Sequence, residues 1–302
     1  MFYKITALNS LKTLFYLSPL AILIGPFSGD LVISSMAFLF LIIMTYQKKT
    51  KYFYNRYTVF FIFFIVYLII SSLISDFKIL SLEASLFYFR FYIFSLSVWY
   101  LLDEDNIILR KFSIVLLITI SFAILNGYFQ YFYGQNIFGI VSDSHSRLTL
   151  LLSDKLYLGG YITRFLPLCF GLMIVSFYKN WNPYIYALLF FILFISSDIL
   201  VFITGERTAF LLLIMLTLLF IFLVSSLKAV RIFGFIFSAI LIIIISFNSV
   251  TLKERNIDHT LRQLGITSDQ YSPRHTPLYI GSYLVFKDNI IFGTGPKTYR
   301  EI

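Results

Sequence analysis

Long uninterrupted runs of apolar residues dominate this sequence and restrict the folds that are open to it. About 20 apolar residues suffice to cross a bilayer, and continuous runs satisfy the backbone there only as helices, since barrel strands would alternate. Because 59% of the residues are apolar and 13% are charged, we exclude a water-soluble enzyme. The sequence therefore predicts an all-α, polytopic membrane protein with about nine transmembrane helices. The expected spans are 13–25, 31–46, 58–75, 84–102, 112–132, 158–178, 185–203, 208–226 and 232–250.

The basic residues between these segments predict the orientation of the chain. Eleven cations lie in loops that share one side: Lys4, Lys12, Lys48, Lys49, Lys51, Arg56, Arg110, Lys111, Lys179, Lys228 and Arg231. The positive-inside rule assigns that side, with the N-terminus, to the cytoplasm and places residues 251–302 outside. The net charge of +9 is thus an orientation signal, and we expect no nucleic-acid partner.

Two parts of the chain follow from this topology. Residues 1–250 are expected to form a helical bundle in the membrane, and residues 251–302 to begin a large external loop. Within that tail, the stretch from Pro277 to Phe286 predicts a short amphipathic helix, followed by a turn at Gly293 to Lys297. The turn lacks the spacing of a nucleotide-binding P-loop.

Metal and cofactor chemistry has no visible basis in the sequence. The three histidines, His145, His259 and His275, show no metal-ligand spacing, and Cys169 is the only cysteine. We therefore expect neither a metal site nor a cofactor.

Four arginines break the charge pattern, because they lie on or near the outer side. Arg147 lies in the 133–157 connection, Arg207 follows Glu206 in the turn before the eighth span, and Arg164 lies about two helical turns inside the sixth span. Arg90 lies about 9 Å below the outer edge of the fourth span. A charged side chain within the membrane costs at least ~2.5–3.5 kcal/mol, so such residues commonly have a partner or a function.

Two interpretations of these arginines remain open. Their long stems can snorkel to the interface, and Asp198 in the seventh span offers a partner for a structural ion pair. Alternatively, the arginines form a positive, outward-facing cavity, because guanidinium groups bind phosphate oxygens bidentately. The ligand would then be an anionic lipid head such as a diphosphate.

Four stretches stand out in order along the chain: Phe87-Tyr-Phe-Arg-Phe91, Leu158-Gly-Gly-Tyr-Ile-Thr-Arg-Phe-Leu-Pro167, Thr204-Gly-Glu-Arg-Thr-Ala-Phe210, and the tail from Ser272 to Arg300. In these stretches the sequence resembles the O-antigen ligase and polymerase superfamily of bacterial envelope glycosyltransferases. The third matches the family pattern Thr-Gly-x-Arg-x-Ala, and the tail is similar to the family's amphipathic helix and Gly-x-Gly-Pro turn. Together they cover most of the chain from residue 80 onward.

This resemblance implies a metal-independent glycosyl transfer on the periplasmic face of the inner membrane. The donor would be a glycan on undecaprenyl diphosphate, and the acceptor of a ligase would be lipid A–core. By family likeness, Arg207 and Arg164 hold the diphosphate, Arg147 is a further candidate, and Glu206 and Arg90 support the site. The general base of the family is a histidine beyond the Gly-x-Gly-Pro turn.

The sequence departs from the family at two points. It stops at Ile302, before the segment that carries the family histidine, and Lys155 stands where an acid is usual. We therefore expect this 302-residue chain to be inactive in glycan transfer. An O-antigen polymerase is the alternative within the family, and a transporter or flippase of a lipid-linked anion is the alternative from another class.

Overall fold

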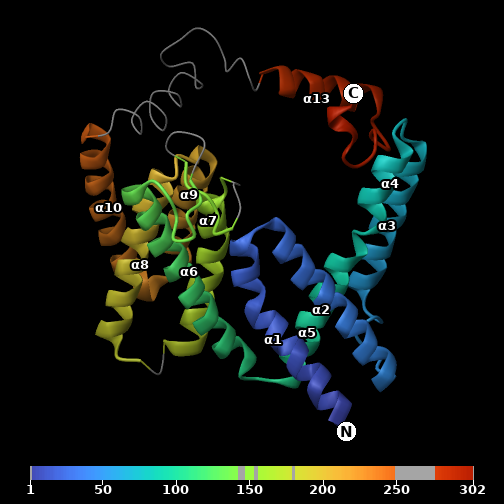
Figure 1. Ribbon diagram of the computed structural model, residues 1–302, viewed down its shortest axis with the longest axis horizontal. Helices are drawn as coiled ribbons and strands as arrows, with labels where there is room; N and C mark the ends of the chain where they lie inside the picture. The colour runs from blue at the N-terminus through green and yellow to red at the C-terminus, as the bar shows by residue number, and fades with distance from the viewer. Residues whose placement is uncertain (1, 142–146, 153–155, 179–180, 249–275, 302) are drawn as a thin grey trace. The chain divides into compact units, whose positions relative to one another are not determined.

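The protein is described here by a computed structural model that covers residues 2–141, 147–152, 156–178, 181–248 and 276–301 (Figure 1). Its α-helices are α1 (Phe2–Ile24), α2 (Pro26–Gln47), α3 (Arg56–Ile74), α4 (Lys78–Leu86), α5 (Phe89–Glu104), α6 (Ile108–Tyr133), α7 (Leu158–Phe177), α8 (Pro183–Ile203), α9 (Arg207–Leu223), α10 (Lys228–Asn248) and α13 (Thr276–Asp288). Two short 3-10 helices, η1 (Ser225–Leu227) and η3 (Thr298–Arg300), complete the described elements. These residues include no strand, and an isolated β-bridge joins Gln135 and Val141.

The lengths of these helices confirm the all-α, multi-pass membrane class. Within the described ranges, eight helical segments are long and apolar enough to cross a membrane, with α4 and α5 counted as one segment. The expected eighth span, 208–226, corresponds to α9, which has only 17 residues. The count of nine spans therefore stays a prediction, as do the orientation and the boundary near residue 250.

The fourth expected span, 84–102, is not one continuous helix. α4 ends at Leu86 and α5 begins at Phe89, so the chain breaks at Phe87 and Tyr88. The stretch from Lys78 to Glu104 still has the length and hydropathy of one span, and it contains no proline or glycine that would have marked the break. The break makes Arg90 the second residue of a new helix rather than a residue inside a continuous span.

The chain divides into two compact units. Unit 1 comprises Met1–Phe15, Leu31–Asn106 and Asp269–Ile302, and unit 2 comprises Tyr16–Asp30 and Ile107–Ser268. The C-terminal elements α13 and η3 thus belong to the same unit as α3, α4 and α5.

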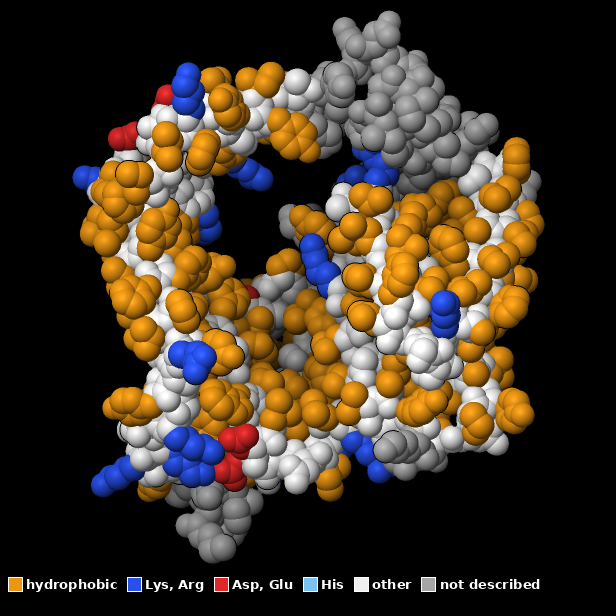
Figure 2. Space-filling model, turned by 180° about the vertical axis from the view of Figure 1, so that it is seen from behind, with side chains coloured by type: hydrophobic (Ala, Val, Ile, Leu, Met, Phe, Trp, Pro, Cys, Tyr) orange, Lys and Arg blue, Asp and Glu red, His pale blue; other side chains and the backbone are white. Residues whose placement is uncertain are grey.

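In unit 1, the pair formed by α3 and α4 buries small polar residues and exposes aromatic ones. Ser72 and Ser85 are fully buried and their hydroxyl groups lie 2.5 Å apart, whereas Phe60 and Phe63 on α3 are exposed. Hydrophobic side chains likewise cover the sides of the helices in Figure 2. Small residues between helices and large apolar residues on the outside are typical of packing in a lipid environment.

Three ion pairs connect the end of α5 to other parts of unit 1. The pairs are Lys12 with Asp105 (2.7 Å), Lys49 with Glu104 (2.7 Å) and Lys51 with Asp103 (3.0 Å). All three lysines were expected on one side of the membrane, so the pairs agree with the expected grouping of these loops. Their partly exposed side chains imply small contributions to stability.

In unit 2, aromatic rings join α7, α8 and α9. Phe170 packs against Phe190 and Phe194 with ring centroids 4.9 and 4.4 Å apart, and Phe194 contacts Phe220 at 5.1 Å. Such ring pairs add attraction beyond the burial of apolar area.

Arg231 is not the loop cation that the charge pattern predicted. α10 begins at Lys228, three residues before it, and the Arg231 side chain is buried against Asp198 of α8. Sequence analysis placed the span from residue 232 because an isolated arginine at the end of an apolar run resembles a flanking residue. The correction removes one of the eleven cations from the orientation signal.

Candidate functional site

The turn between α8 and α9 is closed by short-range contacts of Thr204. Its hydroxyl donates to the carbonyl oxygen of Val201 (2.7 Å) and accepts from the backbone N–H of Glu206 (3.4 Å). Gly205 between them has φ +65°, and α9 begins directly after Glu206. The turn thereby places the Glu206 carboxylate beside the first turn of α7.

Glu206 caps the N-terminus of α7. The backbone N–H groups of Gly159 and Gly160 donate to its two carboxylate oxygens at 2.8 and 3.0 Å. The first N–H groups of a helix have no partner within the helix and favour a negative charge. Residue 159 is glycine for a steric reason, because a Cβ atom there would lie 2.6 Å from Oγ1 of Thr204.

Two arginines lie close enough to this carboxylate to act on it electrostatically. Arg147 and Arg164 both interact electrostatically with Glu206. Arg164 lies one turn after Gly160, and its Nη1 atom turns back toward the start of α7, 3.6 Å from the position of a Cβ on Gly160. Arg164 is exposed and has no ion pair within the part of the chain that the structure describes. Arg207, the first residue of α9, follows Glu206 directly and is half-buried.

The position of Arg147 depends on a buried amide that sequence analysis missed. Two residues later, Thr149 donates its backbone N–H to Oε1 of Gln130 (2.9 Å), and Nε2 of Gln130 donates to the Thr149 hydroxyl (3.0 Å). Asn136 binds the same loop, because its side chain donates to the carbonyl oxygens of residues 150 and 151. The sequence did contain a signal for these contacts: Gln130 and Asn136 lie near the end of an apolar span, and buried polar groups need hydrogen-bond partners.

Arg147 carries an unused donor. Its Nε atom is buried and lacks a hydrogen-bond partner in the described residues. A buried donor without a partner is costly, so this atom favours an acceptor oxygen supplied by a ligand. The structure thus gathers three of the sequence-predicted site residues, Arg147, Arg164 and Glu206, with Arg207 next to Glu206 in the chain.

The other candidates lie elsewhere. Arg90 belongs to unit 1 and lines a cavity there. Asp198 pairs with Arg231 and not with an arginine of this cluster. His145, His259 and His275 lie outside the described residues, and within those residues no group of three His, Cys, Asp or Glu side chains could hold a metal ion.

Burial raises the pKa of Glu206 above its ordinary value of 4.5, against the opposing effects of the Gly159 and Gly160 N–H groups and of Arg147 and Arg164. The folded state therefore binds the proton more tightly than the unfolded state, and Glu206 contributes less stability as the pH rises above 4.5.

We expect the variant Glu206→Gln to gain stability relative to the wild type as the pH rises from 4.5 toward neutrality. Thermal unfolding in detergent across this range measures the difference, with the exposed Asp76→Asn as control for the lost charge. The assignment would be contradicted if the wild type became more stable relative to Glu206→Gln as the pH rises over the same range.

The arrangement suits the binding of an anion. The N-terminus of α7 already binds one carboxylate, Arg147 and Arg164 add positive charge near it, and the buried Nε atom of Arg147 is a donor for a further oxygen. No protein-family model, curated protein or solved structure matches this chain.

Proposed function

We propose that this cluster holds the diphosphate of an undecaprenyl-linked glycan, in an O-antigen ligase-like glycosyltransferase of the bacterial inner membrane. The observation that carries the proposal is the gathering of Arg147 and Arg164 around Glu206 at the start of α7. The motif Thr204–Phe210, which resembles the family, forms the turn that brings Glu206 there.

The proposed chemistry uses fixed positive charge and no metal or cofactor. Guanidinium groups remain charged at any relevant pH and bind phosphate oxygens with two parallel hydrogen bonds. As a glycan leaves the carrier, charge develops on the departing diphosphate, and arginines placed beside it stabilise that charge. The acceptor in this proposal is a sugar hydroxyl of lipid A–core, on the periplasmic face.

Glu206 offsets part of the positive charge of this cluster. Its carboxylate neutralises part of the arginine charge and satisfies the helix N-terminus when no ligand is bound.

A binding comparison tests the proposal on the chain in lipid nanodiscs. We expect a glycan on undecaprenyl diphosphate to bind at least tenfold more tightly than the same glycan on undecaprenyl monophosphate. The extra phosphate offers one more charge-assisted interaction, which contributes about 1.5–3 kcal/mol, or about tenfold or more. Native mass spectrometry of matched titrations measures the ratio, and chelation of divalent metals by EDTA should leave it unchanged.

Two results would count against this function. Equal affinity for the two carriers would mean that the arginines do not recognise a diphosphate. Movement of the lipid-linked glycan across the bilayer of proteoliposomes, with no preference for the diphosphate, would favour a transporter instead.

A further inference from the structure

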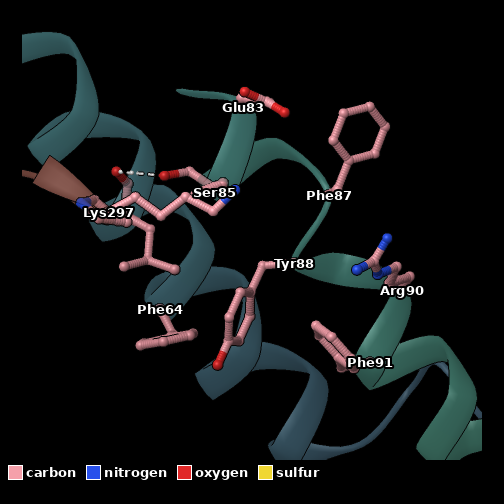
Figure 3. A pocket seen from close by; sticks show the side chains of 11 residues that line it. Phe64, Glu83, Ser85, Phe87, Tyr88, Arg90, Phe91 and Lys297 are labelled. Carbon is pink, nitrogen blue, oxygen red and sulfur yellow. Dashed lines mark hydrogen bonds between the residues drawn. The ribbon is translucent and has the colours of Figure 1, made fainter. Parts of the chain in front are cut away.

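A cavity in unit 1 lies beside the break between α4 and α5. Its volume is about 460 Å³, which falls in the range of small-ligand sites, roughly 300–1,000 Å³. The walls are mainly aromatic: Phe64, Phe87, Tyr88 and Phe91 line the space in Figure 3. Three charged residues join them, Glu83, Arg90 and Lys297.

The helix break creates this space. After α4 ends, Tyr88 donates its backbone N–H to Ser85 (3.2 Å) and Phe91 donates to Tyr88 (3.2 Å), so single turns replace a continuous helix. Arg90 then stands at the start of α5, with its guanidinium 5.0 Å from the ring centre of Phe91. Interrupted helices in membrane proteins are tolerated where they line a cavity, and they commonly form ligand sites.

The turn that follows α13 closes the cavity and is bound firmly to α3. Three hydroxyl groups spaced four residues apart, two on α3 and one at its C-cap, donate to carbonyl oxygens of the segment 291–294. The pairs are Tyr67 with Ile291 (2.8 Å), Ser71 with Phe292 (2.5 Å) and Ser75 with Thr294 (2.5 Å). This ladder fixes the position of the next residues, including Lys297.

The backbone of the turn is adapted to direct Lys297 into the cavity. Gly295 has φ +96°, and a Cβ there would lie 2.5 Å from Oγ of Ser81, so only glycine fits. Lys297 itself has φ +65°, one of two such residues other than glycine in the described ranges. Strained backbone of this kind persists where the surroundings impose it and is concentrated at ligand sites. Figure 3 shows the side chains of Lys297 and Arg90 reaching the cavity from different elements.

The charges of the cavity indicate the ligand. Lys297 and Glu83 make no ion pair with any residue that the structure describes. Together with Arg90, they place two cations and one acid along the wall of the same cavity. Cations bind phosphate, a carboxylate accepts hydrogen bonds from hydroxyl groups, and exposed aromatic walls suit an apolar chain. The geometry points to a binding site for the phosphate diester of a membrane lipid whose headgroup carries hydroxyl groups, as in phosphatidylglycerol. This site is separate in composition from the arginine cluster of unit 2 and does not depend on the proposed transferase function.

Native mass spectrometry of the full chain in detergent tests this site. Titration with phosphatidylglycerol should show specific binding that is about tenfold weaker in Lys297→Gln, the loss expected for one charge-assisted contact. The matched control is Lys287→Gln, which removes an exposed lysine from the last turn of α13 and should leave binding unchanged. Gel filtration shows whether each variant is folded. Equal binding by the wild type and Lys297→Gln would overturn the site.

Two further ligands separate the possible sources of the phosphate. Phosphatidylcholine, whose headgroup has no hydroxyl, should bind at least fivefold more weakly than phosphatidylglycerol, and Glu83→Gln should reduce that preference. Glycerol 3-phosphate alone should bind far more weakly than the lipid, because it leaves the aromatic walls uncovered. Equal binding of the two lipids, or binding of glycerol 3-phosphate as tight as that of the lipid, would contradict the proposal.

Discussion

Removing either charge of the buried Asp198–Arg231 pair should lower the free energy of unfolding by about 3–5 kcal/mol, because the remaining charge loses its partner in an environment without water. The pair is bidentate, with Nη1 and Nη2 of Arg231 donating to the two oxygens of Asp198 at 2.8 and 3.1 Å. Both side chains are nearly inaccessible, at 3% and 2% exposed. We expect this loss in Asp198→Asn and in Arg231→Gln, measured by chemical unfolding in detergent.

The contacts around the pair explain the size of this effect. The Ser238 hydroxyl donates to Asp198 (2.9 Å), Arg231 also donates to the Thr217 hydroxyl, and its guanidinium lies 4.4 Å from the ring centre of Phe194. Three helices, α8, α9 and α10, are joined by this one group of polar atoms. A single substitution therefore disturbs the packing of all three.

A double-mutant cycle distinguishes the pair from general damage to the helices. The double variant Asp198→Asn/Arg231→Gln carries no unpaired charge, so its loss should be clearly smaller than the sum of the two single losses. Lys228→Gln is the matched control, since it neutralises an exposed cation three residues earlier on the same helix. Additive losses, or single variants as stable as Lys228→Gln, would show that the pair does not hold the three helices together.

The membrane class was predictable because apolar length is a property of the sequence alone. A run such as 58–75 needs no knowledge of its neighbours to be recognised, and α3 occupies nearly the same residues. The interruption at Phe87 and Tyr88 was not predictable in this way, since apolar aromatic residues are compatible with both a helix and a break. In this unit, residues that are far apart in the sequence contact one another: the Ser75 hydroxyl donates to the carbonyl oxygen of Thr294. The sequence alone does not show such contacts.

Part of the candidate site was predictable, because cations on the expected outer side of the membrane depart from the charge pattern of the loops. Arg147, Arg164 and Arg207 stood out because they oppose the charge pattern of the loops, and the first two lie around Glu206 in the structure. The role of Gln130 was not predictable, because it depends on a hydrogen bond to Thr149 across a loop. The partner of Asp198 was equally hidden, since Arg231 is 33 residues away in the chain.

The central claim is that Arg147 and Arg164, near Glu206, hold a diphosphate, and their removal should have the second large effect. Arg147→Gln and Arg164→Gln each delete a charge-assisted contact that contributes about 1.5–3 kcal/mol, so each should weaken binding about tenfold or more. The double variant should lose about a hundredfold. Glutamine keeps a polar side chain at both positions, and Arg164 is exposed, which limits the effect on folding.

The most direct measurement is the dissociation constant of undecaprenyl diphosphate for the wild type and for Arg147→Gln/Arg164→Gln in nanodiscs, with the exposed Arg110→Gln on α6 as a control for net charge. The claim predicts that the double variant binds about a hundredfold more weakly, while Arg110→Gln binds as the wild type does. A folded double variant that binds undecaprenyl diphosphate as tightly as the wild type would contradict it.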